Sequence, residues 1–338
     1  MAQMRDLILG FWDDVEKALA QPIPDLTNWS QPNQIGHLLL CGMGGSGIAG
    51  SLIQKLWATE AHGIRSVTLM VHRDYQLPWI GGLWGVFLSS YSGQTEETLE
   101  CAAEARSRGL PCMVFTSGGQ LQEEAQKANW PVCILPSGRP PRACLGYSWF
   151  LQMRALRKLG VLQSDWWQAL PELLKKFRQR QPLLDEDAQE LAHHLAYRFL
   201  LLVTDDMLHP VAERWMQQLS ENAKAFSHIS YVPEMNHNEL VGWQSLPDNT
   251  TVILLEHESQ HPRVRLRYQF LRRYLEERSQ PYVRVRSPEK TLLESYLYLI
   301  HLGDLLSDHL ATRKGVDSMD ITVLQELKRF LDEHRTET

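Results

Sequence analysis

Short, continuous apolar runs separated by amphipathic stretches organise the first half of the chain. Such runs predict buried strands, and the 3.6-residue periodicity between several of them predicts helices. The predicted strands are 37–41, 66–71, 84–90, 111–116 and 131–136, and the predicted helices are 46–60, 95–109 and 119–128. Strands buried on both faces and alternating with helices are typical of a parallel sheet with helices on each side.

A second α/β pattern follows a charged, helical stretch at 156–195. The predicted strands are 198–204, 228–232, 251–256 and 282–286, and the predicted helices are 210–226, 262–279, 289–312 and 319–335. We therefore divide the chain into an N-terminal helix and linker (1–32), a first α/β domain (33–155) and a second α/β domain with a C-terminal helix (156–338).

Composition narrows the class of protein. The 338 residues are 43% hydrophobic and 22% charged, which is ordinary for globular proteins, and the net charge of -6 argues against a nucleic-acid-binding surface. No apolar stretch is long enough to predict a membrane span, and no targeting segment is visible. The five cysteines are odd in number and without a CxxC pair, so we expect reduced thiols in a cytoplasmic protein.

A glycine turn follows the first predicted strand. Gly42, Gly44 and Gly47 satisfy GxGxxG at a helix start, where free backbone N–H groups bind anions. The turn alone is compatible with a dinucleotide site, for which Asp74 supplies an acidic residue after the next strand, with a smaller phosphate, or with a simple tight turn.

A hydroxyl-rich loop after the third predicted strand favours the smaller phosphate. Ser90, Ser92 and Thr95 precede another helix, and each can donate a hydrogen bond to a phosphate oxygen. Parallel strands end at one edge of the sheet, so this loop and the glycine turn converge there. Helix capping is the alternative role of such residues.

These two loops resemble those of the sugar isomerase (SIS) domain. Further motifs resemble the bifunctional phosphoglucose/phosphomannose isomerase family over nearly the whole chain from about residue 37. They are VHRDYQLP (71–78), PPRA (140–143), RWMQQLSENAK (214–224), PEMNHNELVGW (233–243) and a C-terminal lysine helix. The resemblance implies two flavodoxin-like SIS domains, each a parallel sheet flanked by helices.

The resemblance also implies an aldose–ketose isomerase. It would interconvert glucose 6-phosphate, and mannose 6-phosphate, with fructose 6-phosphate through a cis-enediol(ate). Glu221 would be the base, and His237 would open the sugar ring from the neighbouring subunit of a homodimer, with Glu234 or Glu239 orienting its ring. Arg142, rather than the nearby Arg139, would stabilise the intermediate.

Lys328, near the ring oxygen, would be catalytic and open the ring together with His237. The remaining implied residues bind substrate, and Gly45, Ser46, Ser90, Ser92 and Thr95 would hold the phosphate. The family has a threonine–proline pair about seven residues before the lysine, whereas this chain has Ile321-Thr322. Thr322 is therefore expected to contact substrate after a one-residue shift, and this departure leaves the accepted epimers open.

Two further expectations complete the sequence analysis. No HxH, HExxH or paired-cysteine motif is present, so we predict chemistry without a metal or other cofactor. The alternative function is a non-catalytic SIS protein that binds a phosphosugar for regulation, which would require neither Glu221 nor His237.

Overall fold

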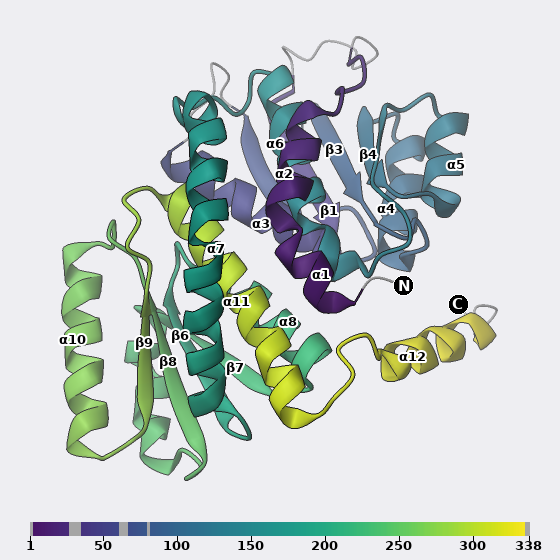
Figure 1. Ribbon diagram of the computed structural model, residues 1–338. Helices are drawn as coiled ribbons and strands as arrows, with labels where there is room; N and C mark the ends of the chain where they lie inside the picture. Colours follow the sequence, from purple (N-terminus) through teal and green to yellow (C-terminus); the bar gives the residue numbers. More distant parts are fainter. Residues whose placement is uncertain (1–2, 27–34, 61–66, 80–81, 335–338) are drawn as a thin grey trace.

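Two parallel sheets, each covered by helices, make up the computed structural model (Figure 1). The structure describes residues 3–26, 35–60, 67–79 and 82–334. None of the helices in these ranges combines the length and the apolar character needed to cross a membrane.

The first sheet has the order β2-β1-β3-β4-β5, which is the flavodoxin-like order. Its strands are β1 (His37–Gly42), β2 (Thr68–His72), β3 (Trp84–Ser89), β4 (Cys112–Thr116) and β5 (Val132–Ile134). Its helices are α3 (Gly44–Thr59), α4 (Glu96–Ser107), α5 (Gly119–Lys127) and α6 (Leu145–Lys158), the last preceded by the 3-10 helix η2 (Pro141–Cys144). Every residue of β3 is buried, as the continuous apolar run predicted.

The second sheet repeats this order with four strands, β7-β6-β8-β9. Its strands are β6 (Phe199–Asp205), β7 (Ser227–Val232), β8 (Thr250–Glu256) and β9 (Tyr282–Arg286). Its helices are α7 (Trp166–Leu195), α8 (His209–Ala223), α9 (Glu239–Gly242), α10 (Pro262–Glu277), α11 (Leu292–Lys314) and α12 (Thr322–Glu333), with 3-10 helices η3 (Glu234–His237) and η4 (Trp243–Ser245). The predicted fold class is thereby confirmed.

The predicted N-terminal helix forms as two short helices rather than one. α1 (Met4–Leu9) and α2 (Phe11–Ala20) are separated at Gly10, which leaves the helical conformation. Both helices bury their apolar residues, α1 against α11 and α2 against α6. The segment therefore packs on both domains. The predicted linker, which follows this segment within 1–32, lies partly outside the described residues.

One hydrophobic cluster spans both domains, and each domain has a further cluster of its own. α3 of the first domain packs against α8 of the second, and apolar residues of both helices belong to the same buried cluster. Ion pairs reinforce the junction, with Lys55 bound to Asp206 at 2.7 Å and Arg73 bound to Glu213. The predicted division after residue 155 falls within α6 and stays a prediction.

Candidate active site

The glycine turn between β1 and α3 favours glycine at two of its positions. Gly44 has a φ of +47°, a conformation that other residues rarely adopt. A Cβ on Gly47 would lie 2.4 Å from the Gly42 carbonyl oxygen. The turn leads directly into α3, whose Ser46 and Gly47 N–H groups donate to the Met43 carbonyl oxygen at 3.0 and 3.1 Å. The N–H groups of Gly44 and Gly45 precede them at the start of the helix, where backbone donors bind anions.

The hydroxyl-rich loop after β3 lies beside this turn at the carboxyl edge of the sheet. Ser90 Oγ lies 2.7 Å from Thr95 Oγ1 and also accepts a hydrogen bond from the Gly93 N–H. The Tyr91 N–H donates to Ser46 Oγ at 3.2 Å, which joins the loop to the glycine turn. The structure thus brings together the two loops that the sequence predicted to converge.

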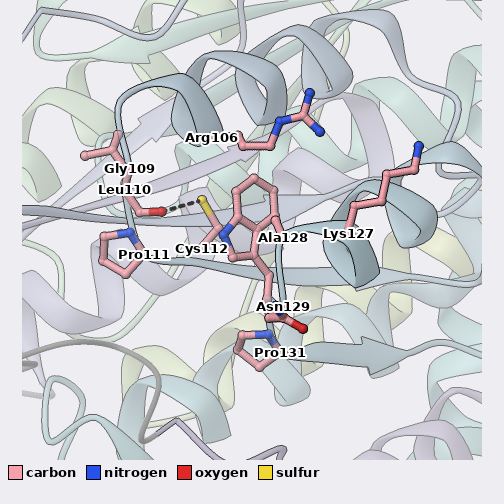
Figure 2. A pocket seen from close by; sticks show the side chains of 10 residues that line it. Arg106, Gly109, Leu110, Pro111, Cys112, Lys127, Ala128, Asn129 and Pro131 are labelled. Carbon is pink, nitrogen blue, oxygen red and sulfur yellow. Dashed lines mark hydrogen bonds between the residues drawn. The ribbon is translucent and has the colours of Figure 1, made fainter.

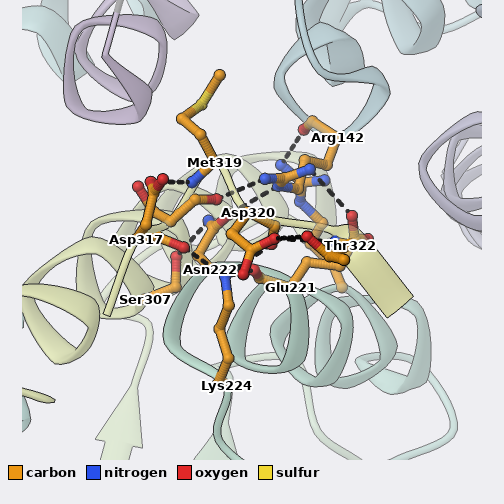
Figure 3. A network of polar contacts seen from close by, with 11 residues as sticks. Arg142, Glu221, Asn222, Lys224, Ser307, Asp317, Met319, Asp320 and Thr322 are labelled. Atoms are coloured by element: carbon orange, nitrogen blue, oxygen red, sulfur yellow. Dashed lines mark hydrogen bonds and ion pairs between the residues drawn. The ribbon is translucent and has the colours of Figure 1, made fainter. Parts of the chain in front are cut away.

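Arg142, in η2, connects this edge to the second domain. Its side chain is 2% exposed. Its Nε donates to Asn222 Oδ1 at 2.7 Å, its Nη1 to Glu221 Oε2 at 3.1 Å, and its Nη2 to the Ser318 carbonyl oxygen at 2.6 Å (Figure 3). Glu221 and Asn222 lie near the end of α8, so one guanidinium group fixes two regions of the second domain.

The glycine turn and Arg142 are in direct contact. A Cβ added to Gly45 would lie 3.2 Å from Arg142 Cα, so the close approach of the two backbones favours glycine there. Through this contact, the anion-binding end of α3 lies next to the arginine that binds Glu221. The predicted base, the predicted electrostatic stabiliser and one phosphate loop thus form one continuous group.

A second buried arginine influences the electrostatics of this group. Burial lowers the pKa of Arg142, the nearby charge of Arg214 lowers it further, and Glu221 opposes the shift. Arg214 pairs with Asp304 at 2.8 Å and donates to the Arg142 carbonyl oxygen at 2.7 Å. Each of the two buried guanidinium groups is thus paired with one carboxylate, Arg142 with Glu221 and Arg214 with Asp304.

Sequence reasoning missed the residues that hold the segment between α11 and α12. Lys224, in the left-handed conformation at the end of α8, donates to the carbonyl oxygens of Glu221 at 2.9 Å and Asp320 at 2.8 Å. A third hydrogen bond goes to the Asp317 carbonyl oxygen. Asn222 and Lys224 both belong to the SENAK motif, and that motif was the signal that could have identified them.

The segment held by Lys224 ends where α12 begins. The Thr322 hydroxyl and N–H both donate to Asp320 Oδ1, at 2.6 and 2.9 Å. Thr322 therefore lies beside the network around Glu221. Lys328 does not, because α12 projects away from the rest of the chain and none of its residues is buried (Figure 1).

His237 lies far from Glu221 within one chain. It ends η3, directly after β7, whose Tyr231 ring is 5.5 Å from the ring of His209 at the start of α8. Glu221 lies twelve residues further along α8, which corresponds to about 18 Å. The two residues therefore lie at opposite ends of the second sheet.

The remaining predicted residues have mixed environments. Ser92 is exposed and accepts a hydrogen bond from the Gln94 N–H at 3.2 Å. Arg139 pairs with the buried Asp14 of α2 rather than with Glu221. Glu239 binds Ser230, and Glu234 accepts a hydrogen bond from Asn238 at 2.9 Å.

A cavity elsewhere in the first domain is not part of this site. It has a volume of about 710 Å³ and lies at the amino edge of the first sheet, among residues at the ends of α4 and α5 that include Arg106 and Lys127 (Figure 2). The loops described above lie at the opposite edge. Across the described ranges, no three His, Cys, Asp or Glu side chains are placed to hold a metal ion together.

Comparison with known proteins identifies the family. A bifunctional phosphoglucose/phosphomannose isomerase of Aquifex aeolicus (strain VF5) is 31% identical over 99% of this chain and 100% of its own length. The chain belongs to the bifunctional phosphoglucose/phosphomannose isomerase family. Another member, from Caldicellulosiruptor bescii, is 30% identical over 88% of this chain and 90% of its own. The predicted family is confirmed.

Two further comparisons agree with this family. Residues 184–331 match the model of the bacterial phospho-glucose isomerase C-terminal SIS domain. The C-terminal domain of a glucosamine-fructose-6-phosphate aminotransferase from Francisella tularensis superposes with a TM-score of 0.72 at 15% identity, covering 93% of this chain and 97% of that one. This structural likeness shows the shared fold.

Proposed function

We propose that this chain interconverts glucose 6-phosphate and mannose 6-phosphate with fructose 6-phosphate. The observation that carries this proposal is the contact of Arg142 with both Glu221 and the phosphate turn. It joins a carboxylate, a fixed cation and an anion-binding helix end, which are the groups that proton transfer next to a carbonyl requires. Membership of the family supports the same reaction.

Glu221 is the base in this proposal. It takes the proton from C2 of the open-chain aldose, and the electron pair of that C–H bond forms the C1–C2 double bond of the cis-enediol(ate). Return of the proton to C1, together with transfer of the O2 hydroxyl proton to O1, turns C2 into the carbonyl carbon and gives the ketose. The Arg142 guanidinium, 3.1 Å from Glu221 Oε2, then stabilises the negative oxygen of the intermediate.

The phosphate binds between the two loops of the first domain. Gly45 and Ser46 contribute the start of α3, and Ser90, Ser92 and Thr95 contribute hydroxyl groups. We do not propose a dinucleotide site on the glycine turn, because it would leave the Ser90–Thr95 loop without a role.

A homodimer completes the site, with His237 supplied by the neighbouring subunit. Within one chain, His237 follows β7 near the start of α8, and Glu221 lies about 18 Å further along that helix, which supports this arrangement. Exposed apolar side chains surround the outer strand β7, namely Phe226 (75% exposed), Tyr231 (43%) and Val241 (73%). Such a patch on an edge strand favours association.

The remaining assignments belong to the same proposal. Thr322 contacts the sugar near C2, Lys328 acts near the ring oxygen, and the enzyme needs no metal. The free, buried cysteines are compatible with a reducing cytoplasm.

Substitution of Glu221 tests the proposed chemistry. The Glu221→Gln variant should lose isomerisation in a coupled assay with fructose 6-phosphate, yet still bind the phosphosugar in calorimetry, because only the base is removed. Glu277→Gln, an exposed site on α10, is the control. Turnover retained by Glu221→Gln would overturn the assignment, and a wild-type protein that binds without turnover would support the regulatory alternative.

Mixing two inactive variants tests the shared site. Glu221→Gln and His237→Ala homodimers should each be inactive, whereas an equal mixture that exchanges subunits should recover about a quarter of wild-type activity, because half of the dimers then hold one intact site. A mixture that stays inactive after confirmed subunit exchange would contradict the contribution of His237 across the interface.

A further inference from the structure

Helix α8 carries a stripe of buried polar side chains. Arg214, Gln218 and Asn222 follow one another at intervals of four residues, so they lie on one side of the helix, and none is more than 1% exposed. Their partners are on α11, where Asp304 and Ser307 are three residues apart and also buried. Apolar side chains of similar volume would hold two helices together at least as well. The stripe therefore indicates a role besides helix packing.

A chain of hydrogen bonds runs from Ser307 through Asn222 to Arg142 (Figure 3). The Ser307 hydroxyl donates to the Asp304 carbonyl oxygen at 2.7 Å, which leaves its oxygen free to accept. It accepts a hydrogen bond from Asn222 Nδ2 at 2.9 Å, and Asn222 Oδ1 accepts one from Arg142 Nε at 2.7 Å. An amide group has a donor on one side and an acceptor on the other. Ser307 therefore keeps the amide oxygen of Asn222 turned toward Arg142.

The carboxylate of Asp304 holds the backbone of Arg142 by a second route. Arg214 Nε donates to Asp304 Oδ1 at 3.0 Å, and Arg214 Nη2 donates to Oδ2 at 2.8 Å. The same Nη2 donates to the Arg142 carbonyl oxygen at 2.7 Å. Gln218 Nε2 completes the group by donating to Asp304 Oδ1 at 3.0 Å. Because the Arg142 backbone also contacts Gly45, this route fixes the arginine relative to the phosphate turn.

Neither route reaches the substrate itself. Arg214 is 1% exposed and Ser307 is 0% exposed. The cavity beside the second route, among Arg142, Gln218, Asp304 and side chains of α1 and α2, has a volume of about 10 Å³. That is about the space of one water molecule and is too small for a sugar phosphate. Arg214 and Ser307 therefore act on a reaction only through Arg142.

We propose that the turn of α11 from Asp304 to Ser307 positions Arg142 to stabilise the reaction intermediate. Ser307 sets the direction of the guanidinium group through Asn222. Asp304 fixes the backbone of the same arginine through Arg214. This inference rests on the proposed function, in which Arg142 faces the enediol(ate). Stabilisation of developing charge requires a cation that is already in place, and an unsupported arginine side chain has many conformations.

Removal of one buried hydroxyl group tests the first route. Ser307→Ala should lower kcat about 10-fold and leave KM within about twofold, because the intermediate loses a fixed cation whereas the phosphate loops keep their contacts. Ser295→Ala is the matched control, since Ser295 is a buried serine of the same helix whose hydroxyl has no hydrogen-bond partner among the described residues. Ser307→Cys retains a weak donor and acceptor and should recover part of the lost kcat. Equal kcat values in Ser307→Ala and Ser295→Ala would overturn the proposal.

A double-mutant cycle separates positioning from a general loss of stability. Asn222→Ala interrupts the same chain of hydrogen bonds, so adding Ser307→Ala to it should change kcat by less than about twofold. A second 10-fold loss in the double variant would mean that Ser307 does not act through Asn222, and it would refute the first route.

Arg214→Lys tests the second route. One ammonium nitrogen does not replace a guanidinium group that binds the Asp304 carboxylate and the Arg142 carbonyl oxygen together. We expect kcat/KM to fall about 10-fold or more, with a higher KM, because the Arg142 backbone also contacts the phosphate turn. Arg5→Lys is the matched control, because Arg5 also pairs with an aspartate of α11, Asp308, at 3.1 Å. Identical kinetics of the two lysine variants would refute the second route.

Crystal structures supply a measurement that does not depend on activity. The Arg142 guanidinium group should leave its position, or occupy two positions, in Ser307→Ala and should stay in place in Ser295→Ala. An unmoved guanidinium group in Ser307→Ala would overturn the positioning role, and an active wild type would then leave the isomerase proposal standing. An inactive wild type in which the group moves only in Ser307→Ala would refute the isomerase alone.

Discussion

The two domains have the same strand order, but they carry different side chains at the place where that order reverses. In the first, Gly42 at the end of β1 pairs with Ser89 at the end of β3, and glycines and hydroxyls follow both strands. In the second, β6 ends in Asp205 and His257 follows β8 directly. The Asp205 carboxylate lies 2.9 Å from His257 Nε2 and accepts the Leu208 N–H at 3.0 Å.

This difference explains why only one domain is expected to bind phosphate. A doubly wound sheet binds ligands where the strand order reverses, at the carboxyl edge. The first domain leaves that place to a ligand's anion, whereas the second occupies it with its own carboxylate. Burial alone would raise the pKa of Asp205, but the hydrogen bonds from His257 and Leu208 hold it below the ordinary value. The second domain instead contributes the opposite end of α8, where Glu221 lies.

The largest effect is expected from the glycine turn of the first domain. Gly47→Ala would place a Cβ against the Gly42 carbonyl oxygen, so the start of α3 must shift. We expect kcat/KM to fall about 100-fold or more, because displacement of a binding group by about 1 Å has effects of this size. Gly36→Ala, before β1 at the opposite edge with nothing within 4 Å, is the control. Unchanged kinetics in Gly47→Ala would refute the phosphate role of the turn.

The second largest effect is expected at the carboxyl edge of the second domain, where a substitution should change stability rather than catalysis. Asp205→Asn should lower the free energy of unfolding in urea at pH 7 by about 1–3 kcal/mol, because a buried charge-assisted hydrogen bond is lost. It should leave kcat and KM unchanged, because the Asp205 carboxylate is already bound to His257 and to the Leu208 N–H. Asp206→Asn, whose side chain is 58% exposed, should change stability by about 0.5 kcal/mol or less.

The lowered pKa of Asp205 also predicts how the stability difference between wild type and Asp205→Asn changes with pH. The pKa of Asp205 is lower in the folded protein than its ordinary value of 3.8. Its contribution to stability is therefore complete above that value and is lost as the pH falls through the lower folded pKa. The difference between wild type and Asp205→Asn should shrink below pH 3.8. A large change in KM for Asp205→Asn would mean that the second edge also binds substrate.

A smaller effect is expected where the two loops of the first edge meet. Ser46→Ala removes the acceptor of the Tyr91 N–H and a proposed phosphate donor. We expect KM for fructose 6-phosphate to rise about 10-fold, the equivalent of one hydrogen bond to a charged group. Ser51→Ala, in the same helix but bound to Arg73, is the matched control. Equal KM values in the two variants would remove Ser46 from the phosphate site.

The smallest effect is expected from metal removal. Turnover on glucose 6-phosphate and on mannose 6-phosphate should stay the same, within about twofold, after dialysis against EDTA, because dipoles, hydroxyls and Arg142 supply the positive field. The ratio of the two turnovers also measures the breadth left open by Ile321-Thr322. Loss of activity with EDTA that zinc restores would contradict metal-independent chemistry.

Local sequence signals predicted most of the fold. The strands of both domains were foreseen because a continuous apolar run records burial on both faces. The glycine turn was foreseen from its GxGxxG motif, which fits a positive φ at Gly44 and a close backbone approach at Gly47. The N-terminal segment was harder, because a single apolar stripe does not record the interruption at Gly10. The family, and with it the candidate site residues, came from motifs that resemble known proteins.

The sequence by itself determined which residue types follow each strand. It therefore also determined which of the two domains can accept a phosphate at the carboxyl edge of its sheet. Only the tertiary structure decided that Arg142 lies buried between Glu221, Asn222 and the Ser318 carbonyl oxygen, since these groups are far apart in the chain. It also separated His237 from Glu221 and left α12 uncovered. Distances between elements depend on how helices pack across the domain junction, and local periodicity carries no record of that packing.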